Sequence, residues 1–147
     1  MNPALRERIL SRHQTLCVEG REYGYFVIQR SLPGAPRFFV GRDETSGYFI
    51  ISDEIKGEFR ELVLRHEMFE IGVLGGHGQN RCQSALFYEL AHCPHQLLRD
   101  YLAYRLDMIQ HLIAWVDDPQ RVGQYPAERR REIERTLRRI KNLLATR

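Results

Sequence analysis

The sequence predicts an α+β fold, in which a small antiparallel sheet is followed by several helices. Between residues 21 and 52, three short segments are rich in aromatic and β-branched side chains, and turn-forming residues separate them. From residue 53 onward, apolar side chains recur at the three- and four-residue spacing of amphipathic helices. A chain of 147 residues has the usual length of one domain, so we expect residues 1–147 to form a single domain.

The first third of the chain is expected to contain one helix and three strands. Residues 1–20 hold an N-terminal helix that ends at about Thr15, because Asn2 and Pro3 are residue types that begin helices. Residues 21–52 form an antiparallel meander, because the connections at residues 32–34 and 43–47 are too short for a crossover. The strands are predicted at Glu22–Arg30, Arg37–Gly41 and Tyr48–Ile51.

The rest of the chain is expected to form four helices. Two of them, the motif helix and a second helix, lie in residues 53–93, and two C-terminal helices lie in residues 94–147. In the last helix an apolar stripe runs along one face, which suits either the core or the seam of a homodimer. The stripe consists of Ile133, Leu137, Ile140 and Leu144. The helices are predicted at Asp53–Leu74, Asn80–Cys93, His95–Val116 and from Pro126 onward.

Composition restricts the class of protein. With 43% hydrophobic and 28% charged residues, the chain has the profile of a folded globule. The three cysteines follow no disulfide spacing, and no apolar run approaches the ~18 residues of a membrane span. Residues 1–10 also lack the apolar stretch of a secretory signal. We therefore expect a cytoplasmic protein without a membrane anchor.

The motif helix places two ionisable side chains on its apolar face. On a helical wheel with His66 at zero, Glu70 falls at about 40°, among the apolar positions that should face the core. A buried carboxylate without a partner costs several kcal/mol, so such groups are paired, protonated or bound to metal. Residues four apart can both reach one ion, so His66 and Glu70 are predicted metal ligands. Glu67 lies at about 100°, beside them.

This segment, from His66 to Glu70, resembles the H-E-x-x-H helix of the zincin metallopeptidases, with glutamate in place of the second histidine. The resemblance, which also fits a small sheet beside the helix, covers roughly residues 23–93. It implies that His66 and Glu70 bind the metal, that Glu67 is the general base, and that the substrate is a peptide or another amide. A glutamate ligand makes the site more anionic, so iron or manganese joins zinc as a candidate cofactor.

A third metal ligand is expected downstream of the motif. Glu89 is the first choice, because on the second helix it shares a face with Cys82 and small or apolar residues. His77 is the other choice, because its glycine-rich turn could bring an imidazole back over the end of the motif helix. Cys82, Cys93 and two nearby histidines fit no zinc-finger or ribbon spacing.

Two other functions stay open at this point. The His66–Glu70 pair could be a structural network in a non-catalytic interaction module, held by tyrosine or arginine side chains such as Arg105. The last helix could bind nucleic acid, since nine basic residues and three acidic ones lie from Arg121 onward. The acidic residues interleaved in that helix argue against nucleic acid. The metal-dependent hydrolase is the favoured prediction.

Overall fold

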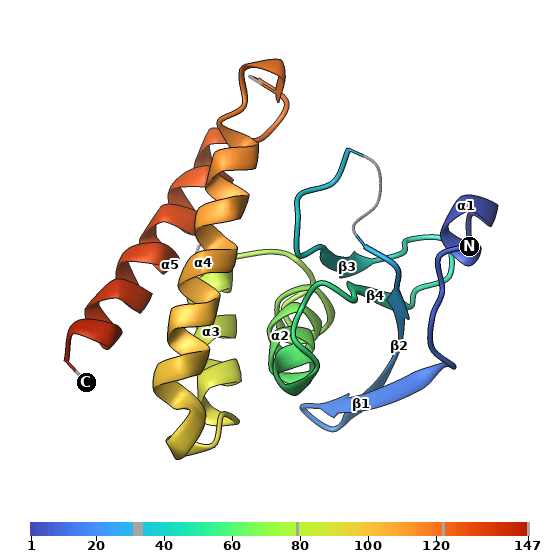
Figure 1. The fold of residues 1–147 in the computed structure, drawn as a ribbon, viewed down its shortest axis with the longest axis horizontal. Helices are drawn as coiled ribbons and strands as arrows, with labels where there is room; N and C mark the ends of the chain where they lie inside the picture. The colour runs from blue at the N-terminus through green and yellow to red at the C-terminus, as the bar shows by residue number, and fades with distance from the viewer. Residues whose placement is uncertain (31–33, 79, 122, 147) are drawn as a thin grey trace.

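The computed structural model describes residues 1–30, 34–78, 80–121 and 123–146. The fold is α+β, as predicted, with a mixed sheet in the order β1-β2-β4-β3 (Figure 1). The strands are β1 (Gln14–Val18), β2 (Arg21–Ile28), β3 (Val40–Arg42) and β4 (Phe49–Ser52). The helices are α1 (Pro3–Arg6), α2 (Arg60–Glu67), α3 (Arg81–Ala91), α4 (Leu98–Val116) and α5 (Ala127–Ala145).

The N-terminal prediction was wrong in the extent of its helix. Asn2 does cap α1, since its Oδ1 accepts the backbone N–H of Ala4 at 2.8 Å, but the helix ends at Arg6. Further along, the chain forms β1 and pairs with β2 in an antiparallel hairpin. The hairpin turn at Glu19 and Gly20 has φ values of 50° and 75°, as a tight turn between twisted strands requires. Strand pairing therefore replaces the predicted helix over residues 14–18.

The predicted three-stranded antiparallel meander also needs correction, because β2 and β4 are parallel. The connection over residues 29–39 is long enough to carry the chain past the position of β4 to the sheet edge, where β3 forms. β4 then returns between β2 and β3, antiparallel to β3. All four residues of β4 are buried, which suits a central strand with a parallel neighbour. Of the predicted turn at 32–34, residues 32 and 33 lie outside the described residues.

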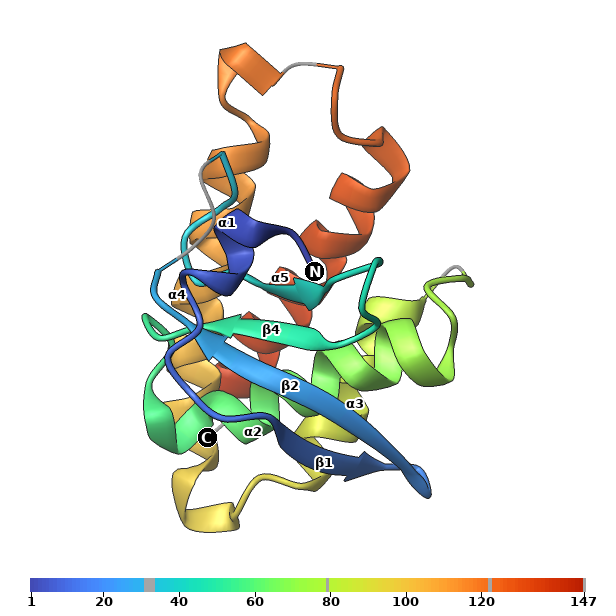
Figure 2. The ribbon, with the colours of Figure 1, turned by 90° about the vertical axis from the view of Figure 1, so that its right-hand side faces the viewer.

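The helices cover the sheet in layers. α2 lies on one face of the sheet, and α3, α4 and α5 lie beyond it, while α1 packs on the opposite face (Figures 1 and 2). The larger core therefore joins the sheet, α2 and α4, and includes Phe49, Leu64 and Tyr101. A second core fills the space among α3, α4 and α5. Polar side chains on the inner face of α2 are shielded from water by these layers.

The motif helix continues past α2 in a wider form. Met68–Val73 is a π-helical segment, and the N–H of Leu74 bonds to the carbonyl of Phe69, five residues earlier, at 2.9 Å. Such segments are rare and often occur at functional sites. The segment passes close to β2: a Cβ built on Gly72 would lie 2.7 Å from the ring of Tyr23. Glycine is therefore the residue that lets this helix approach the sheet.

The apolar stripe of α5 is used inside the chain. Ile133 is 4% exposed and Ile140 is completely buried, and both pack with apolar residues of α3 and α4 such as Leu86 and Leu102. The face predicted as core or dimer seam therefore contributes to the chain's own core. Among the described residues, we find no helix that combines the length and the apolar character needed to cross a membrane.

Candidate functional site

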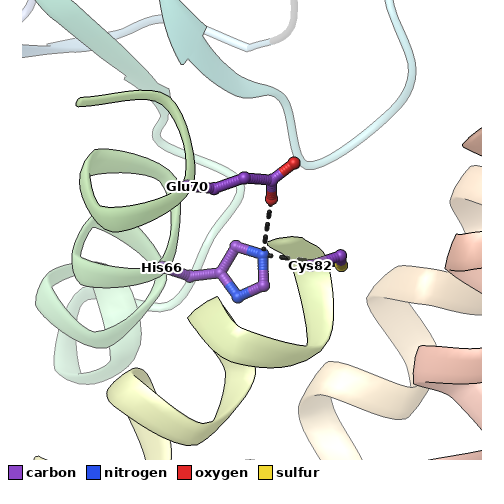
Figure 3. Close-up of side chains that lie close together, drawn as sticks. All are labelled: His66, Glu70 and Cys82. Carbon is purple, nitrogen blue, oxygen red and sulfur yellow. Dashed lines mark hydrogen bonds and ion pairs between the residues drawn. The ribbon is translucent and has the colours of Figure 1, made fainter. Parts of the chain in front are cut away.

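His66 and Glu70 point into the protein interior, as the helical wheel predicted. His66 is 4% exposed and Glu70 is 2% exposed. The Nε2 atom of His66 lies 3.0 Å from Oε2 of Glu70, one helical turn away (Figure 3). His66 belongs to α2 and Glu70 to the π-helical segment that follows it. The two side chains form the centre of a buried polar cluster.

Glu89 contacts the other nitrogen of the imidazole. Its Oε1 lies 2.5 Å from Nδ1 of His66, and its two oxygens also accept hydrogen bonds from Arg105 and Tyr101. Glu89 comes from α3, whereas Arg105 and Tyr101 come from α4, so three helices meet at this carboxylate. Because Glu89 engages Nδ1, it leaves Nε2 directed toward Glu70. The two carboxylates therefore lie on opposite sides of the imidazole and do not converge on one point.

Cys82 completes a compact set of ligand-type atoms. Its Sγ lies 3.7 Å from Nε2 of His66, and Cys82 is 8% exposed in the first turn of α3. One ligand atom from each of His66, Glu70 and Cys82 can be chosen so that all three lie within 4.8 Å of one another (Figure 3). The sequence prediction did not include Cys82 as a ligand. The available signal was its position seven residues before Glu89, two helical turns away on the same face.

Two arginines hold the carboxylate of Glu70 from the opposite side. Oε1 of Glu70 accepts from Nε of Arg81 at 3.1 Å and from Arg129 of α5, while Oε2 faces the imidazole. Arg129 also donates to Glu132 at 3.0 Å, and Glu132 accepts the backbone N–H of Cys82. The arginines thus fix the Glu70 side chain and tie α5 to the start of α3.

The charges of this cluster shift the protonation of its members. Burial opposes a charged imidazole, but the carboxylate of Glu89, with Cys82 and Glu70, more than offsets it, so the pKa of His66 is raised well above its ordinary value. Burial also penalises the Glu70 carboxylate, yet His66 and Arg129 together lower its pKa to about 2. For Glu89, Arg105 and His66 outweigh burial and lower the pKa. In the absence of metal, these pKa shifts favour an imidazolium at His66 between the carboxylates of Glu70 and Glu89.

Glu67 occupies a different environment beside the cluster. It lines a cavity of about 270 Å³ together with His66, Glu70 and Cys82. The other walls are mainly apolar and include Met108 and Trp115. Burial, reinforced by the nearby charge of Glu70, raises the pKa of Glu67 to about 7. The predicted general base is therefore a half-buried carboxyl group on the same cavity as the ligand-type atoms.

The remaining candidates lie outside the cluster. His77 is exposed in the turn after the π-helical segment and lines a separate cleft. His92 and His95 are exposed, and Cys93 lies at the far end of α3 from Cys82. Over the ranges that the structure describes, the only group of three or more histidine, cysteine or carboxylate side chains with this geometry is His66, Glu70 and Cys82.

We found no protein-family model, curated protein or solved structure that matches the chain. The zincin resemblance is therefore carried by the short segment from His66 to Glu70 alone. The function has to be argued from the chemistry of the cluster and of the cavity beside it.

Proposed function

We propose that the protein is a metal-dependent hydrolase whose divalent ion is bound by His66, Glu70 and Cys82. The observation that carries the proposal is the close approach of an imidazole nitrogen, a carboxylate oxygen and a sulfur within 4.8 Å at a buried site. These three atom types are the protein ligands of zinc. Glu89 supports the site from outside, since a carboxylate on the second nitrogen fixes the orientation of a metal-binding histidine.

The spacing of these atoms suits a tetrahedral ion. Bond lengths of roughly 2.0–2.3 Å at tetrahedral angles place neighbouring ligand atoms about 3.3–3.6 Å apart. Two of the separations lie just outside that range: Nε2 of His66 is 3.0 Å from Oε2 of Glu70 and 3.7 Å from Sγ of Cys82. The third separation, between Glu70 and Cys82, is no more than 4.8 Å. The thiolate favours zinc over the harder ions iron and manganese. Three protein ligands also leave a fourth position for a water or substrate, as in catalytic zinc sites.

Metal binding preserves the charge balance of the interior. Among the described residues, the cluster has three ionised carboxylates, Glu70, Glu89 and Glu132, and four cations, His66, Arg81, Arg105 and Arg129. Glu67 lies beside the cluster, and its pKa is about 7. A divalent ion replaces one proton on His66 and one on the Cys82 thiol, so the net charge of the cluster stays the same. Because the ion adds no net charge to the cluster, the buried arginines repel it no more than they repel the two protons that it replaces.

The cavity provides space for the reacting group. A bound ion would polarise a substrate carbonyl and lower the pKa of a coordinated water. Glu67 faces the same cavity and is the candidate general base, because a carboxyl with a pKa near neutrality can accept a proton at physiological pH. Met108, Ile109 and Leu112 give the cavity an apolar wall that suits an uncharged side chain of the substrate.

The sheet edge supports a peptide as the substrate. β3 is an edge strand of the sheet, and Val40 of β3 lines the cavity together with Phe38 and Phe39. An extended peptide that added to this edge would pass the mouth of the cavity, with its main chain held by hydrogen bonds. This arrangement favours a peptide or protein as the substrate.

A structural role is the second candidate, and one observation favours it. Both nitrogens of His66 already have carboxylate partners, and Glu70 and Glu89 are each held by arginine. A fully satisfied network of this kind can stabilise a core without metal. The protein would then be a non-catalytic interaction module, and substitution of Glu67 would leave its cellular activity intact.

Metal content separates the two candidates. Protein purified without a histidine tag is expected to contain about one divalent ion per chain, and His66→Ala and Glu70→Ala are expected to lose it. His77→Ala is the matched control and should keep the ion, because His77 lies outside the cluster. Glu67→Gln should keep the ion but lose turnover of a quenched fluorescent peptide library. Equal metal content in the wild type and in His66→Ala would contradict the proposal.

A further inference from the structure

A second, larger cavity lies on the other side of Glu70 from the imidazole. It is an open cleft of about 760 Å³ between the start of α3, the start of α5 and the glycine-rich turn that contains His77. Arg81 and Arg129, which hold Glu70, also form part of its wall. The cleft therefore adjoins the proposed metal site and shares two side chains with it.

Four arginine side chains line this cleft: Arg81, Arg129, Arg131 and Arg135. Arg81 and Arg129 are paired with buried carboxylates. Arg131 and Arg135, one turn apart on α5, have no ion pair with any residue that the structure describes. Glu128 and Glu132 are the acidic residues in the wall, and Glu132 is already occupied by Arg129 and the N–H of Cys82. The wall thus keeps guanidinium groups free to bind an anion.

Two helices, α3 and α5, also begin at the wall of this cleft. α3 begins after Asn80 and α5 begins after Pro126, and both residues line the cleft. The side chain of Asn80 makes no hydrogen bond to α3, and a proline such as Pro126 has no side-chain group that could make one. The first N–H groups of a helix bind anions readily, and the helix dipole places partial positive charge there. The start of α5 therefore adds partial positive charge beside the arginines that lack an ion pair among the described residues, whereas at α3 the carboxylate of Glu132 already accepts the N–H of Cys82.

We propose that this cleft binds the oxyanion group, phosphate or carboxylate, of a small molecule. Guanidinium groups bind such groups by paired hydrogen bonds, which suits Arg131 and Arg135 on adjacent turns. If the metal site is catalytic, a short peptide substrate is such a molecule and the cleft holds its terminal carboxylate, so this role rests on the proposed function. The anion binding itself stands on the cleft alone.

The composition of the cleft favours a small anion over a nucleic acid. A nucleic acid backbone needs a basic surface that continues over several phosphates. Here Glu128 and Glu132 interrupt the basic residues within the cleft, and Glu134 pairs with Arg130 elsewhere on α5. Arg131 and Arg135 thus form a short basic stretch within a concave site, which suits a small anion better than a continuous nucleic-acid backbone.

The test is calorimetric titration of the untagged protein with inorganic phosphate and, separately, with succinate. Saturable binding of either probe is expected, and the tighter of the two identifies phosphate or carboxylate as the group recognised. The double variant Arg131→Ala/Arg135→Ala should bind that probe at least about tenfold more weakly, since a hydrogen bond to a charged group is worth roughly 1.5–3 kcal/mol. Arg138→Ala, an exposed arginine on the same helix outside the cleft, is the matched control and should bind as the wild type does.

Three results would overturn the inference. These are the absence of saturable binding of either probe, equal binding by the wild type and the double variant, and tighter binding of a single-stranded oligonucleotide with a steep dependence on salt. Metal content measured on the same samples separates this inference from the proposed function. A double variant that keeps its metal but loses the anion supports the cleft, whereas metal-free wild type that still binds the anion contradicts only the metal proposal.

Discussion

The Glu89 carboxylate lies 2.5 Å from Nδ1 of His66, although the two residues are 23 positions apart in the chain. This contact joins α3 to α2 through a buried charged pair, and Arg105 extends it to α4. Glu89 therefore has two roles in this cluster. It fixes which nitrogen of His66 faces Glu70 and Cys82, and it neutralises the buried guanidinium of Arg105.

Replacement of Glu89 should destabilise the fold strongly. Glu89→Gln removes the negative charge but keeps the shape, so the charges of Arg105 and His66 lose their buried partner. Loss of one member of a buried ion pair typically costs about 3–5 kcal/mol. Urea unfolding at neutral pH should show a decrease of this size. Glu61→Gln, at an exposed position on α2, should change the free energy of unfolding by less than about 0.5 kcal/mol. A small change in the free energy of unfolding of Glu89→Gln would show that the network contributes little to the stability of the fold.

The Glu67 carboxyl should produce a characteristic dependence of stability on pH. Its pKa rises from 4.5 to about 7 on folding, so the folded protein holds this proton more tightly than the unfolded chain. The free energy of unfolding of metal-free protein should therefore decrease as the pH rises from 4.5 to about 7, and the contribution should stay constant above that. Glu67→Gln should remove this decrease, and Glu61→Gln should retain it. If the free energy of unfolding depends on pH in the same way in the wild type and in Glu67→Gln, the pKa of Glu67 is ordinary.

The π-helical segment should depend on glycine at position 72. In Gly72→Ala the new methyl group would meet the Tyr23 ring at 2.7 Å, so either the ring or the segment has to move. Such overpacking typically costs about 1–3 kcal/mol. At Gly57 an added Cβ would come no closer than 3.9 Å to any other group, so Gly57→Ala should leave stability unchanged or slightly higher. Comparison of the two thermal unfolding midpoints provides the measurement, and equal midpoints would contradict the tight contact.

Metal binding should release protons. The imidazole of His66 and the thiol of Cys82 must both lose a proton to become ligands. At pH 6 about two protons should therefore be released per zinc ion bound, measured by calorimetry in buffers with different ionisation enthalpies. The Cys82→Ser variant should release about one proton fewer. Binding without proton release would place the metal elsewhere.

The helical wheel was sufficient to predict that His66 and Glu70 face inward, because amphipathic periodicity fixes direction along one helix. It also placed Glu89 correctly on a face directed at the interior, since its neighbours on that face are small or apolar. The role of Glu89 on Nδ1 and the position of Cys82 depend on how α3 packs against α2. Such packing involves contacts between residues far apart in sequence, and the periodicity of apolar residues within one helix does not specify these contacts.

For the sheet, too, the sequence predicts some features and leaves others undetermined. The apolar segments were found near β2, β3 and β4, but the parallel pairing of β2 with β4 depends on the path of the connecting loop. The sequence predicts a helix where β1 forms, because the cap at Asn2 marks where a helix begins but not where it ends. The turn at Glu19 and Gly20 instead brings residues 14–18 against β2. Local sequence signals identify where elements begin. Whether residues 14–18 form a helix or a strand depends on their pairing with β2.

Cobalt substitution reports whether Cys82 binds a metal ion together with His66. Cobalt(II) bound to a thiolate gives an intense charge-transfer absorption, so its spectrum reports whether sulfur is a ligand. In a Cys17→Ser/Cys93→Ser background, which removes the cysteines outside the cluster, one equivalent of cobalt should produce this absorption in a tetrahedral spectrum. Further substitution of Cys82→Ser or His66→Ala should abolish the absorption. If the spectrum lacks the thiolate band, or if the band persists without Cys82, the metal site at His66, Glu70 and Cys82 is contradicted.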